Sequence, residues 1–394
     1  MEINRREYEE EFNNLSMRLS KIFASESSYQ NMQKYIKGLL GSAERKNGWQ
    51  MAEYLGEKTP YSLQQLLYRA RFSADELRDG LREYVSENIG EEDGTIVIDE
   101  TGFLKQGKHS CGVKRQYSGT AGRIENCQIG VFMTYASSKG HSPVDRRLYM
   151  PQEWMDDSER CKKAGVPEGV VFKTKPQMAL EMLKEAVNTE FPFTWVTGDC
   201  VYGDYTDIRS WLEQNGKFYV FCVSGKSYVW RGHKQESISS IIKNLPEEGW
   251  FEASCGDGSK GVRIYDWMAL PMNPGVTDGY ERSILIRRSK SSPDELRAYV
   301  CFSPTSTPKE KLVEIAGCRW TVETCFKESK SEVGLDHYEI RSYDGWHKHI
   351  TFSCIALAFL TVLSSRSFDT KPFQQHNPGS SSLDDFKKGR NLRV

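Results

Sequence analysis

The segment from Gly94 to Val223 alternates strand-like and helix-like runs, and this alternation restricts the fold more than any other feature of the sequence. Residues 95–98 form a short, largely β-branched run directly after Gly94, as buried strands often do. The following runs predict strands over 109–118 and 127–137, a helix over 175–188, a strand over 193–197, a helix over 205–214 and a strand over 218–223. A hairpin followed by alternating strands and helices is typical of a mixed α/β sheet flanked by helices.

Two aspartates come directly after predicted strands of this segment. Asp99 follows the run 95–98, and Asp199 follows the run 193–197 and Gly198. Ligands of open α/β sheets collect at the carboxyl ends of strands, so the two carboxylates are candidates for a common site. A single aspartate in such a place is commonly a turn former or a helix cap. The functional interpretation therefore depends on whether a further carboxylate points to the same place.

Glu323 is the candidate for that third carboxylate. It lies in a predicted helix that is free of Gly and Pro from Arg319 to Lys330, with Pro308 upstream as a helix start. At about 100° per residue, Arg319, Glu323, Phe326 and Lys330 share one narrow arc. An adjacent apolar stripe is formed by Ile315, Cys318, Val322, Cys325 and Val333. We expect Glu323 to lie between two cations at the edge of a buried face. The alternative is an amphipathic helix whose ion pair contributes a few tenths of a kcal/mol.

The N-terminal region is predicted to be all helical, and it contains a pair of helices that resembles a helix-turn-helix. The first helix covers residues 44–55, and the second begins at Ser62, which forms a capping-box pattern with Gln65. The polar side chains expected to face DNA from this pair are Gln64, Gln65, Arg69 and Arg71. Any small helical bundle contains such a pair, so the pattern alone leaves DNA contact open.

The order of these patterns predicts several regions along the chain. Residues 224–304 are rich in Gly, Ser and aromatic side chains with strand-like runs, which indicates a β-rich insertion before the helix of Glu323. The expected organisation is a helical DNA-binding domain over 1–90, a catalytic core over 91–223 and 305–368 interrupted by the insertion over 224–304, and a mobile polar tail over 369–394.

Composition restricts the cellular setting more than the function. Lys and Arg total 53 against 54 Asp and Glu, so a polyanionic partner must meet a local basic surface. The 10 cysteines form no C-x-x-C pair and no zinc-ligand spacing, and without a secretory signal they indicate reduced thiols in the cytoplasm. The apolar run 350–363 is too short to span a bilayer, which favours a buried helix. His337, His347 and His349 are better explained by packing or DNA contact than by a metal.

Several motifs, in this order, resemble those of one enzyme family. They are Ile98-Asp-Glu-Thr-Gly-Phe103, Gln116-Tyr-Ser-Gly119, Val196-Thr-Gly-Asp-Cys-Val-Tyr-Gly203, Arg319-Trp-Thr-Val-Glu323 and Gly334-Leu-Asp-His-Tyr-Glu-Ile-Arg341. Over about residues 40–365 the chain is similar to DDE transposases of bacterial insertion sequences, of the 701 kind and related to the insertion-sequence-four group. The wider group carries a Y-x2-R-x3-E-x6-K signature. Arg319, Glu323 and Lys330 match it, whereas Ala316 stands in place of its Tyr and leaves that DNA contact unassigned.

The resemblance implies a ribonuclease-H-like or retroviral-integrase fold, with Asp99, Asp199 and Glu323 as the acidic triad. It further implies two Mg²⁺ ions per site, with Mn²⁺ as a substitute, held by the three carboxylates for phosphodiester cleavage. Arg319, Lys330, Lys327 and Arg341 would contact the DNA. The implied function is cut-and-paste transposition, in which a homodimer binds the terminal repeats and transfers 3′-hydroxyl ends into target DNA in the bacterial nucleoid. The alternatives are an inactive DNA-binding descendant acting as a repressor or architectural protein, and a ribonuclease-H-type nuclease without strand transfer.

Overall fold

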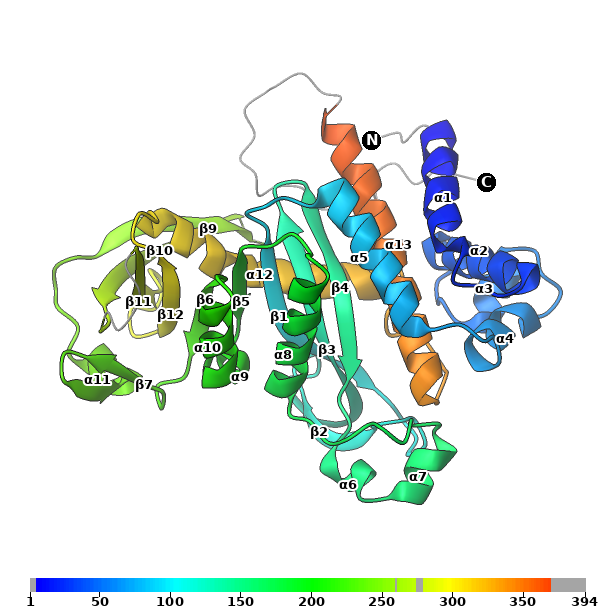
Figure 1. Cartoon of the computed structure of the whole chain (residues 1–394), viewed down its shortest axis with the longest axis horizontal. Coiled ribbons are helices and arrows are strands. Elements are labelled where there is room, and N and C mark those ends of the chain that lie inside the picture. Colours follow the sequence, from blue (N-terminus) through cyan, green and yellow to red (C-terminus); the bar gives the residue numbers. More distant parts are fainter. Residues whose placement is uncertain (1–4, 259–260, 274–278, 370–394) are drawn as a thin grey trace.

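A single large sheet runs through the middle of the molecule (Figure 1). The structure is a computed structural model and describes residues 5–258, 261–273 and 279–369. The sheet has 10 strands in the order β2-β3-β1-β5-β6-β12-β11-β10-β9, with β4 also paired to β3. The strands are β1 (Thr95–Leu104), β2 (Lys114–Ser118), β3 (Arg123–Ser137), β4 (Gly140–Leu148), β5 (Trp195–Gly198), β6 (Phe218–Val223), β7 (Tyr228–Arg231), β8 (Lys234–Ser237), β9 (Phe251–Gly258), β10 (Gly261–Pro271), β11 (Tyr280–Arg288) and β12 (Leu296–Pro304).

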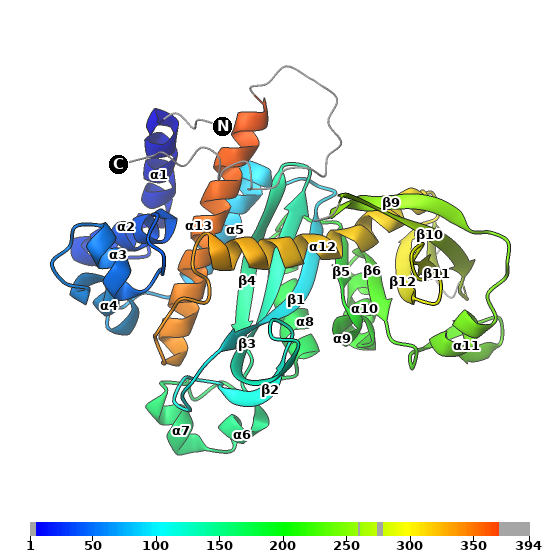
Figure 2. The ribbon, with the colours of Figure 1, turned by 180° about the vertical axis from the view of Figure 1, so that it is seen from behind.

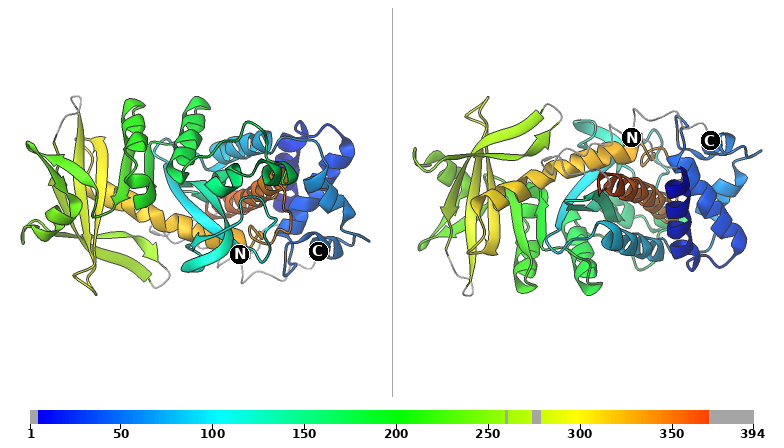
Figure 3. Two further views of the ribbon diagram at one scale, coloured as in Figure 1. Left: turned by 90° about the horizontal axis from the view of Figure 1, so that it is seen from below. Right: turned by 90° about the horizontal axis from the view of Figure 1, so that it is seen from above.

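Helices cover both faces of this sheet, and those nearest the N-terminus of the chain gather at one end of the molecule. They are α1 (Arg5–Ser20), α2 (Glu26–Leu40), α3 (Gly48–Tyr54), α4 (Tyr61–Tyr68), α5 (Ala74–Ile89), α6 (Gln152–Met155), α7 (Ser158–Lys163), α8 (Lys175–Asn188), α9 (Cys200–Gly203), α10 (Thr206–Gln214), α11 (Ile238–Lys243), α12 (Lys309–Ser331) and α13 (Tyr343–Asp369). Seen from below and above, α1–α4 and the insertion lie at opposite ends of the long axis (Figure 3). The expected polar tail lies outside the described residues, except for Asp369.

The strands β4, β3, β1, β5 and β6 form the core part of the sheet; β1, β3, β5 and β6 correspond to predicted strands, the strand predicted over 109–118 is the shorter β2, and β4 was not predicted. β3 is antiparallel to both β1 and β4, while β5 is parallel to β1 and to β6. An antiparallel meander continued by two parallel strands is the ribonuclease-H-like arrangement, so the expected fold class is confirmed. The predicted helix over 175–188 and strand over 218–223 coincide with α8 and β6.

The strand β1 is longer than predicted, and Asp99 lies inside it instead of after it. Parallel pairing with β5 ends at Ile98↔Gly198, whereas antiparallel pairing with β3 continues to Leu104↔Cys127. The second half of β1 pairs with β3 only. It contains polar residues, so a search for apolar runs does not detect it as part of the strand. The end of the apolar run therefore marks where the pairing of β1 with β5 stops, and the strand itself ends six residues later.

The insertion continues the central sheet. β12 pairs antiparallel with β6, and β11, β10 and β9 follow in turn, while β7 and β8 form a separate two-stranded sheet. The helix α12 then leads back from the insertion to the core (Figure 2). At Gly317 a Cβ atom would lie 2.3 Å from the carbonyl oxygen of Cys255, so only glycine allows α12 to approach β9 this closely. The insertion thus fixes the first half of α12.

The two faces of the sheet carry different helices. α8 and α10 cover one face, and α12 crosses the other face at the level of β1 and β5 (Figures 1 and 2). The helix Tyr343–Arg366 is long and apolar enough to cross a membrane, but 83% of its most apolar window is buried in the protein. It packs against β4, α5 and α2 as a core helix, as the apolar run 350–363 predicted.

The N-terminal helices share one hydrophobic core with the central sheet. Leu15 of α1, Leu39 of α2 and Leu81 of α5 belong to the same buried cluster as Ile96 of β1 and Phe359 of α13. The predicted boundary near residue 90 therefore does not coincide with a break in packing. A truncation there would remove one wall of the core.

The second helix of the N-terminal pair does not begin as predicted. The residue that precedes α4 as its N-cap is Pro60, which has no side chain to accept a hydrogen bond. Ser62 lies inside the helix, and its buried hydroxyl has no hydrogen-bond partner among the described residues. The capping-box prediction was wrong because Pro60 fixes a helix-compatible φ two residues before Ser62.

A buried cluster of charges joins α5, β4 and α8. Asp145 is fully buried and accepts from Arg82 Nη2 at 2.5 Å and from Arg147 Nη1 at 3.1 Å. Arg78 and Arg147 also pair with Glu185 of α8, at 2.8 and 2.5 Å. Burial alone would raise the pKa of Asp145, but the surrounding arginines outweigh it and hold the pKa below its ordinary value. Asp145 is therefore ionised and central to this cluster.

Two of the three histidines near the C-terminus are buried in the core, as the packing explanation predicted. Burial lowers the pKa of His347 and His349 to about 3, so both are neutral. His349 Nδ1 accepts from the hydroxyl of Tyr35 at 2.8 Å, and its Nε2 donates to the carbonyl of Gly334 at 3.2 Å. These contacts use both ring nitrogens of His349, so it has no nitrogen left for a metal.

Candidate active site

The sheet register places Asp99 and Asp199 beside each other. Ile98 and Gly198 are the last paired residues of the parallel strands β1 and β5, and an aspartate follows each of them. Neighbouring strands lie about 4.8 Å apart, so the two aspartates are neighbours across the point where β5 ends. Asp99 accepts from the backbone N–H of Glu100 at 2.8 Å, and Asp199 caps α9 by accepting from Val201 N at 2.9 Å.

Both aspartates sit in surroundings that disfavour their charge. Burial raises the pKa of Asp99 to about 7, and the neighbouring carboxylates of Asp199 and Glu100 add to this effect. Burial and Glu100 also raise the pKa of Asp199. Within the described part of the chain, neither aspartate forms an ion pair with a Lys, Arg or His side chain. Two adjacent, largely buried carboxylates with raised pKa values are typical of a functional site that binds a cation.

Glu323 reaches the same region from α12 but is paired with Arg319. Its Oε1 accepts from Arg319 Nη2 at 2.8 Å, and its side chain is 40% exposed. The guanidinium of Arg319 also acts electrostatically on Asp99 and Asp199, where it offsets part of the rise in pKa that burial causes. Arg319 thus lies among all three predicted carboxylates. Its guanidinium is a positive charge that acts on both aspartates.

The residues present fit a divalent cation held by oxygen atoms. Among the described residues, no three His, Cys, Asp or Glu side chains are close enough to form a finished metal site. Asp99 and Asp199 supply two adjacent carboxylates, while Glu323, the third predicted carboxylate, is paired with Arg319. Carboxylate oxygens without nitrogen or sulfur ligands suit Mg²⁺ and Mn²⁺.

Glu100 belongs to this site, although sequence reasoning did not single it out. Its Oε1 accepts from Lys175 Nζ of α8 at 2.5 Å, and its Oε2 accepts from the hydroxyl of Tyr202 at 2.5 Å. Alternation along β1 directs Glu100 to the face opposite Asp99, towards α8 and α9. It therefore ties the strand of Asp99 to the short helix that Asp199 caps. The signal in the sequence was the acidic pair 99–100 together with a tyrosine three residues after Asp199.

Lys330 does not flank Glu323, contrary to the expectation from the helical arc. Its ammonium donates to Thr101 Oγ1 at 2.8 Å, to Thr120 Oγ1 at 3.0 Å and to the carbonyl of Gly102 at 3.3 Å. Seven residues along a helix span about 10 Å, which puts Lys330 beyond reach of Glu323 and over β1. The other two basic candidates, Lys327 and Arg341, are exposed.

The candidate DNA-facing residues of the N-terminal pair lie far from the carboxylates. Arg69 and Arg71 are exposed, while Gln64 and Gln65 are half-buried. They belong to α4 and to the segment after it, at the end of the molecule remote from the insertion (Figures 1 and 3). The structure therefore does not bring these residues together with Asp99 and Glu323. A contact with both regions requires an extended ligand.

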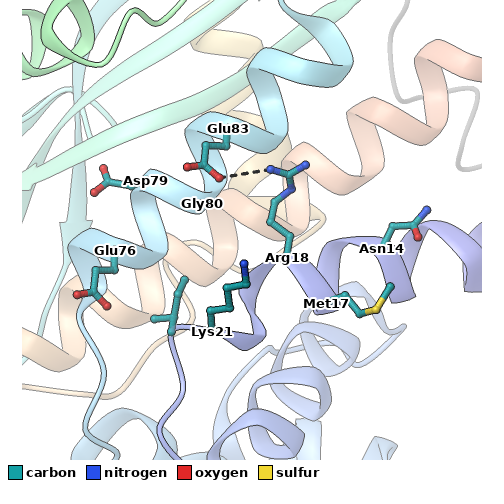
Figure 4. Close-up of a pocket in the computed structure, with 9 residues that line it drawn as sticks. Asn14, Met17, Arg18, Lys21, Glu76, Asp79, Gly80 and Glu83 are labelled. Atoms are coloured by element: carbon teal, nitrogen blue, oxygen red, sulfur yellow. Dashed lines mark hydrogen bonds and ion pairs between the residues drawn. The ribbon is translucent and has the colours of Figure 1, made fainter.

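A groove of about 690 Å³ lies between α1 and α5, away from the carboxylates (Figure 4). Arg18 of α1 reaches across it to Glu83 of α5 at 3.3 Å. Its lining mixes charges of both signs with Met17 and Gly80, without a convergent set of catalytic groups. The chemistry is therefore assigned to the open carboxylate site, which suits a ligand too large for a pocket.

The fold and the acidic site together define a nuclease of the ribonuclease-H-like class, and comparison with known proteins gives its family. A family model described as DDE superfamily endonuclease matches residues 18–239, and one described as Transposase DDE domain matches residues 163–359. The chain belongs to the DDE superfamily of endonucleases, as a transposase. It is 24% identical over 320 residues to the "Probable transposase for insertion sequence element IS701" of Microchaete diplosiphon, covering 79% of this chain and 77% of that protein. DDE enzymes act on DNA and depend on divalent metal ions.

Proposed function

We propose that this transposase binds the ends of its insertion sequence, cleaves the phosphodiester bonds there and transfers the 3′-hydroxyl ends into target DNA by a cut-and-paste route. The observation that carries the proposal is the juxtaposition of Asp99 and Asp199 at the end of β5, with Glu323 on the helix that crosses them. We assign these three residues as the catalytic and metal-binding carboxylates. Two Mg²⁺ ions, or Mn²⁺, would stabilise the attacking and leaving oxygens of the displacement when bound.

Arg319 has a double role in this proposal. Its guanidinium neutralises the site by pairing with Glu323 at 2.8 Å and by acting on both aspartates. Phosphate oxygens of DNA are an equally good planar partner for a guanidinium. With DNA bound, Arg319 would pair with a phosphate, and Glu323 would then be available as a metal ligand beside Asp99 and Asp199. In the free enzyme the pairing with Arg319 would weaken cation binding at Glu323, while Asp99 and Asp199 would remain available to a cation.

We assign the remaining DNA contacts to exposed basic and polar side chains. Lys327 and Arg341 are exposed and would contact the DNA backbone, with Lys330 contributing its charge from a half-buried position. Gln64, Gln65, Arg69 and Arg71 of the N-terminal helices then contact the element end at a distance from the cleaved bond. A homodimer acting at paired ends in the bacterial nucleoid completes the proposal, with residues 1–90 and 224–304 as the arms on either side of the core.

The experiment that tests the proposed function is incubation of the purified protein with DNA carrying the ends of its element, Mg²⁺ and a target plasmid. Cleaved ends joined to the plasmid support transposition. Cleavage without joined products would indicate a simple nuclease. Specific binding without any cleavage would indicate an inactive descendant that represses or shapes DNA.

Divalent cations should stabilise the protein, and the effect should grow with pH. The pKa of Asp99, raised to about 7, means that the folded protein binds a proton between about pH 4 and 7 that the unfolded chain releases. The unfolding free energy of the metal-free protein therefore falls as pH rises through this window. Metal binding needs the ionised carboxylate, so Mg²⁺ or Mn²⁺ should raise the melting temperature at pH 8 more than at pH 5.5.

The measurement is a melting curve with and without the metal ion, for the wild type and for Asp99→Asn. The variant should show no metal-dependent rise at either pH. Its metal-free form should be more stable than the wild type at pH 8, by at least about 1 kcal/mol, because the amide removes the repulsion with Asp199 and Glu100. An equal metal response in both proteins would place the cation elsewhere.

Replacing Arg69 and Arg71 together by Ala should weaken binding to the element ends. Both side chains are exposed, so the variant should melt at the wild-type temperature. If both side chains contact phosphates, the salt dependence of binding should flatten by about two units on a log–log plot, whereas a base contact would show as lost preference for the end duplex. The measurement is fluorescence anisotropy with end and random duplexes over a salt series. Unchanged affinity and slope would remove α4 from the DNA interface. Lys21→Ala, at an exposed position outside the α3–α4 pair, serves as the charge control.

A further inference from the structure

The hairpin formed by β2 and β3 has an exposed face that the proposed function has not yet used. In the register of the hairpin, Tyr117 lies opposite Ile124, and Arg115 lies opposite Asn126. Tyr117 is 64% exposed and Ile124 is 59% exposed. Single exposed apolar residues are ordinary, but here two large ones face each other across a two-stranded ribbon. The pair forms a small, flat apolar platform bordered by the guanidinium of Arg115.

On the opposite face of the hairpin, Ser118 packs against β1 and fixes the platform in place. Ser118 is fully buried, and a Cβ atom on Gly102 would lie 2.4 Å from its hydroxyl, so the hairpin folds back closely over the strand. At the tip, Thr120 contacts Thr101 Oγ1 and the carbonyl of Gly102, both at 3.3 Å. The hairpin is therefore attached to the strand that carries Asp99.

Lys330 ties the same tip to the catalytic helix. Its ammonium bonds Thr120 and Thr101 at 3.0 and 2.8 Å, so the hairpin, β1 and α12 meet at one point. Thr101 is two residues from Asp99, about 7 Å along the strand. Lys330 is seven residues from Glu323, about 10 Å along the helix. These lengths correspond to about two or three nucleotides of a DNA strand.

The positive charge of Arg115 on the platform indicates an anionic polymer as the ligand. Among the described residues Arg115 has no carboxylate partner, although it is exposed on the platform, whereas Lys114 and Arg123 pair with Glu153 and Glu125. A free guanidinium beside an aromatic ring, a few nucleotides from the metal site, matches a strand of nucleic acid with its bases unpaired. In a paired duplex the base faces are covered by their neighbours, so Tyr117 would have nothing to stack on.

We propose that the platform of Arg115, Tyr117 and Ile124 holds unpaired bases of the DNA strand next to the scissile phosphate. Tyr117 stacks on a base, Ile124 packs beside it, and Arg115 binds the adjoining phosphate. The inference rests on the proposed function, since it needs DNA at Asp99 and Asp199. In this proposal the hairpin keeps the bases of the DNA strand unpaired. The unpaired strand then places the scissile phosphate beside the carboxylates.

The test compares a fully paired end duplex with the same duplex carrying three unpaired bases beside the cleavage position, both in metal-free buffer. The wild type should bind the unpaired form more tightly. Tyr117→Ala should lose about tenfold in affinity for the unpaired form, as expected for one lost stacking contact, and change little on the paired form. Tyr117→Phe should keep the preference. Tyr228→Ala, which removes a tyrosine of similar exposure (63%) on β7, should have no effect.

Arg115→Ala should weaken binding to both duplexes and lower the salt slope by about one unit, while Arg115→Lys should restore most of the slope. If Tyr117→Ala binds the unpaired duplex as tightly as the wild type, the platform proposal is wrong. A changed oligomeric state in light scattering, with DNA preference intact, would assign the surface to self-association and also overturn it. If the wild type binds neither duplex, the failure lies with the proposed function.

Discussion

Replacing any one of the three assigned carboxylates by its amide should abolish DNA cleavage while end binding persists. Asp99→Asn, Asp199→Asn and Glu323→Gln keep the size of each side chain but remove the charge that a divalent cation needs. The cation supplies several kcal/mol of transition-state stabilisation, so we expect cleavage to fall by about a thousandfold or more. The measurement is a single-turnover cleavage assay with labelled end DNA, beside a binding assay in the same buffer.

The controls for this series come from the same elements. Asp207→Asn changes an exposed aspartate of α10 close in sequence to Asp199, and Glu314→Gln changes an exposed glutamate of α12 that pairs with Lys311 at 2.9 Å. Both should cleave at the wild-type rate. Near-normal cleavage by one of the three amide variants would show that this residue is not a metal ligand. Loss of end binding together with cleavage would point to misfolding instead.

Asp145→Asn should be among the most destabilising single changes in the protein. The carboxylate of Asp145 is completely buried among Arg78, Arg82, Arg146 and Arg147. Its amide would leave buried guanidinium groups without their central counter-charge, which typically costs about 3–5 kcal/mol. We expect this loss in urea unfolding monitored by fluorescence. Because the arginines hold the pKa of Asp145 below its ordinary value, the group stays ionised above about pH 4 and the loss should not vary between pH 6 and 9.

Asp79→Asn provides the matched control for the buried cluster. Asp79 pairs with Arg78 at 2.7 Å, but its side chain is 47% exposed, so solvent screens the pair. Its loss should change the unfolding free energy by less than about 1 kcal/mol. Equal effects of the two variants would mean that burial of Asp145 does not decide the stability of the cluster.

The sequence predicted the catalytic sheet well because its strands and helices are short, apolar and sharply bounded. α8 and β6 coincide with their predicted ranges, since each has a clear periodicity and a turn at both ends. The second half of β1 was missed because its pairing to β3 on one edge does not require apolar residues. Sequence patterns also did not predict that the insertion extends the sheet, because the pairing between β6 and β12 joins residues about 80 positions apart.

The candidate site was predictable in its carboxylates but not in its connections. The strand-end rule and the helical arc were enough to select Asp99, Asp199 and Glu323, whose metal-binding role stays a prediction. Lys330 shared the arc of Glu323, yet three acceptors on β1 and the hairpin hold its ammonium two turns away. Glu100 was overlooked because its partners, Lys175 and Tyr202, come from distant parts of the chain. Pattern rules apply to one helix or strand at a time, whereas these contacts form between different helices and strands.

The pairing of β12 with β6 makes the insertion a poor candidate for exchange between related enzymes. Residues 224–304 begin and end on neighbouring strands, so they resemble a loop that could be cut out or replaced. Their removal would instead leave β6 as a bare edge strand with its row of backbone groups unpaired, which invites pairing with another chain. It would also strip the first half of α12 of the surface at Cys255 against which Gly317 packs. A chimaera of this transposase with a related enzyme therefore has to take β6, the insertion and α12 together from the same parent protein.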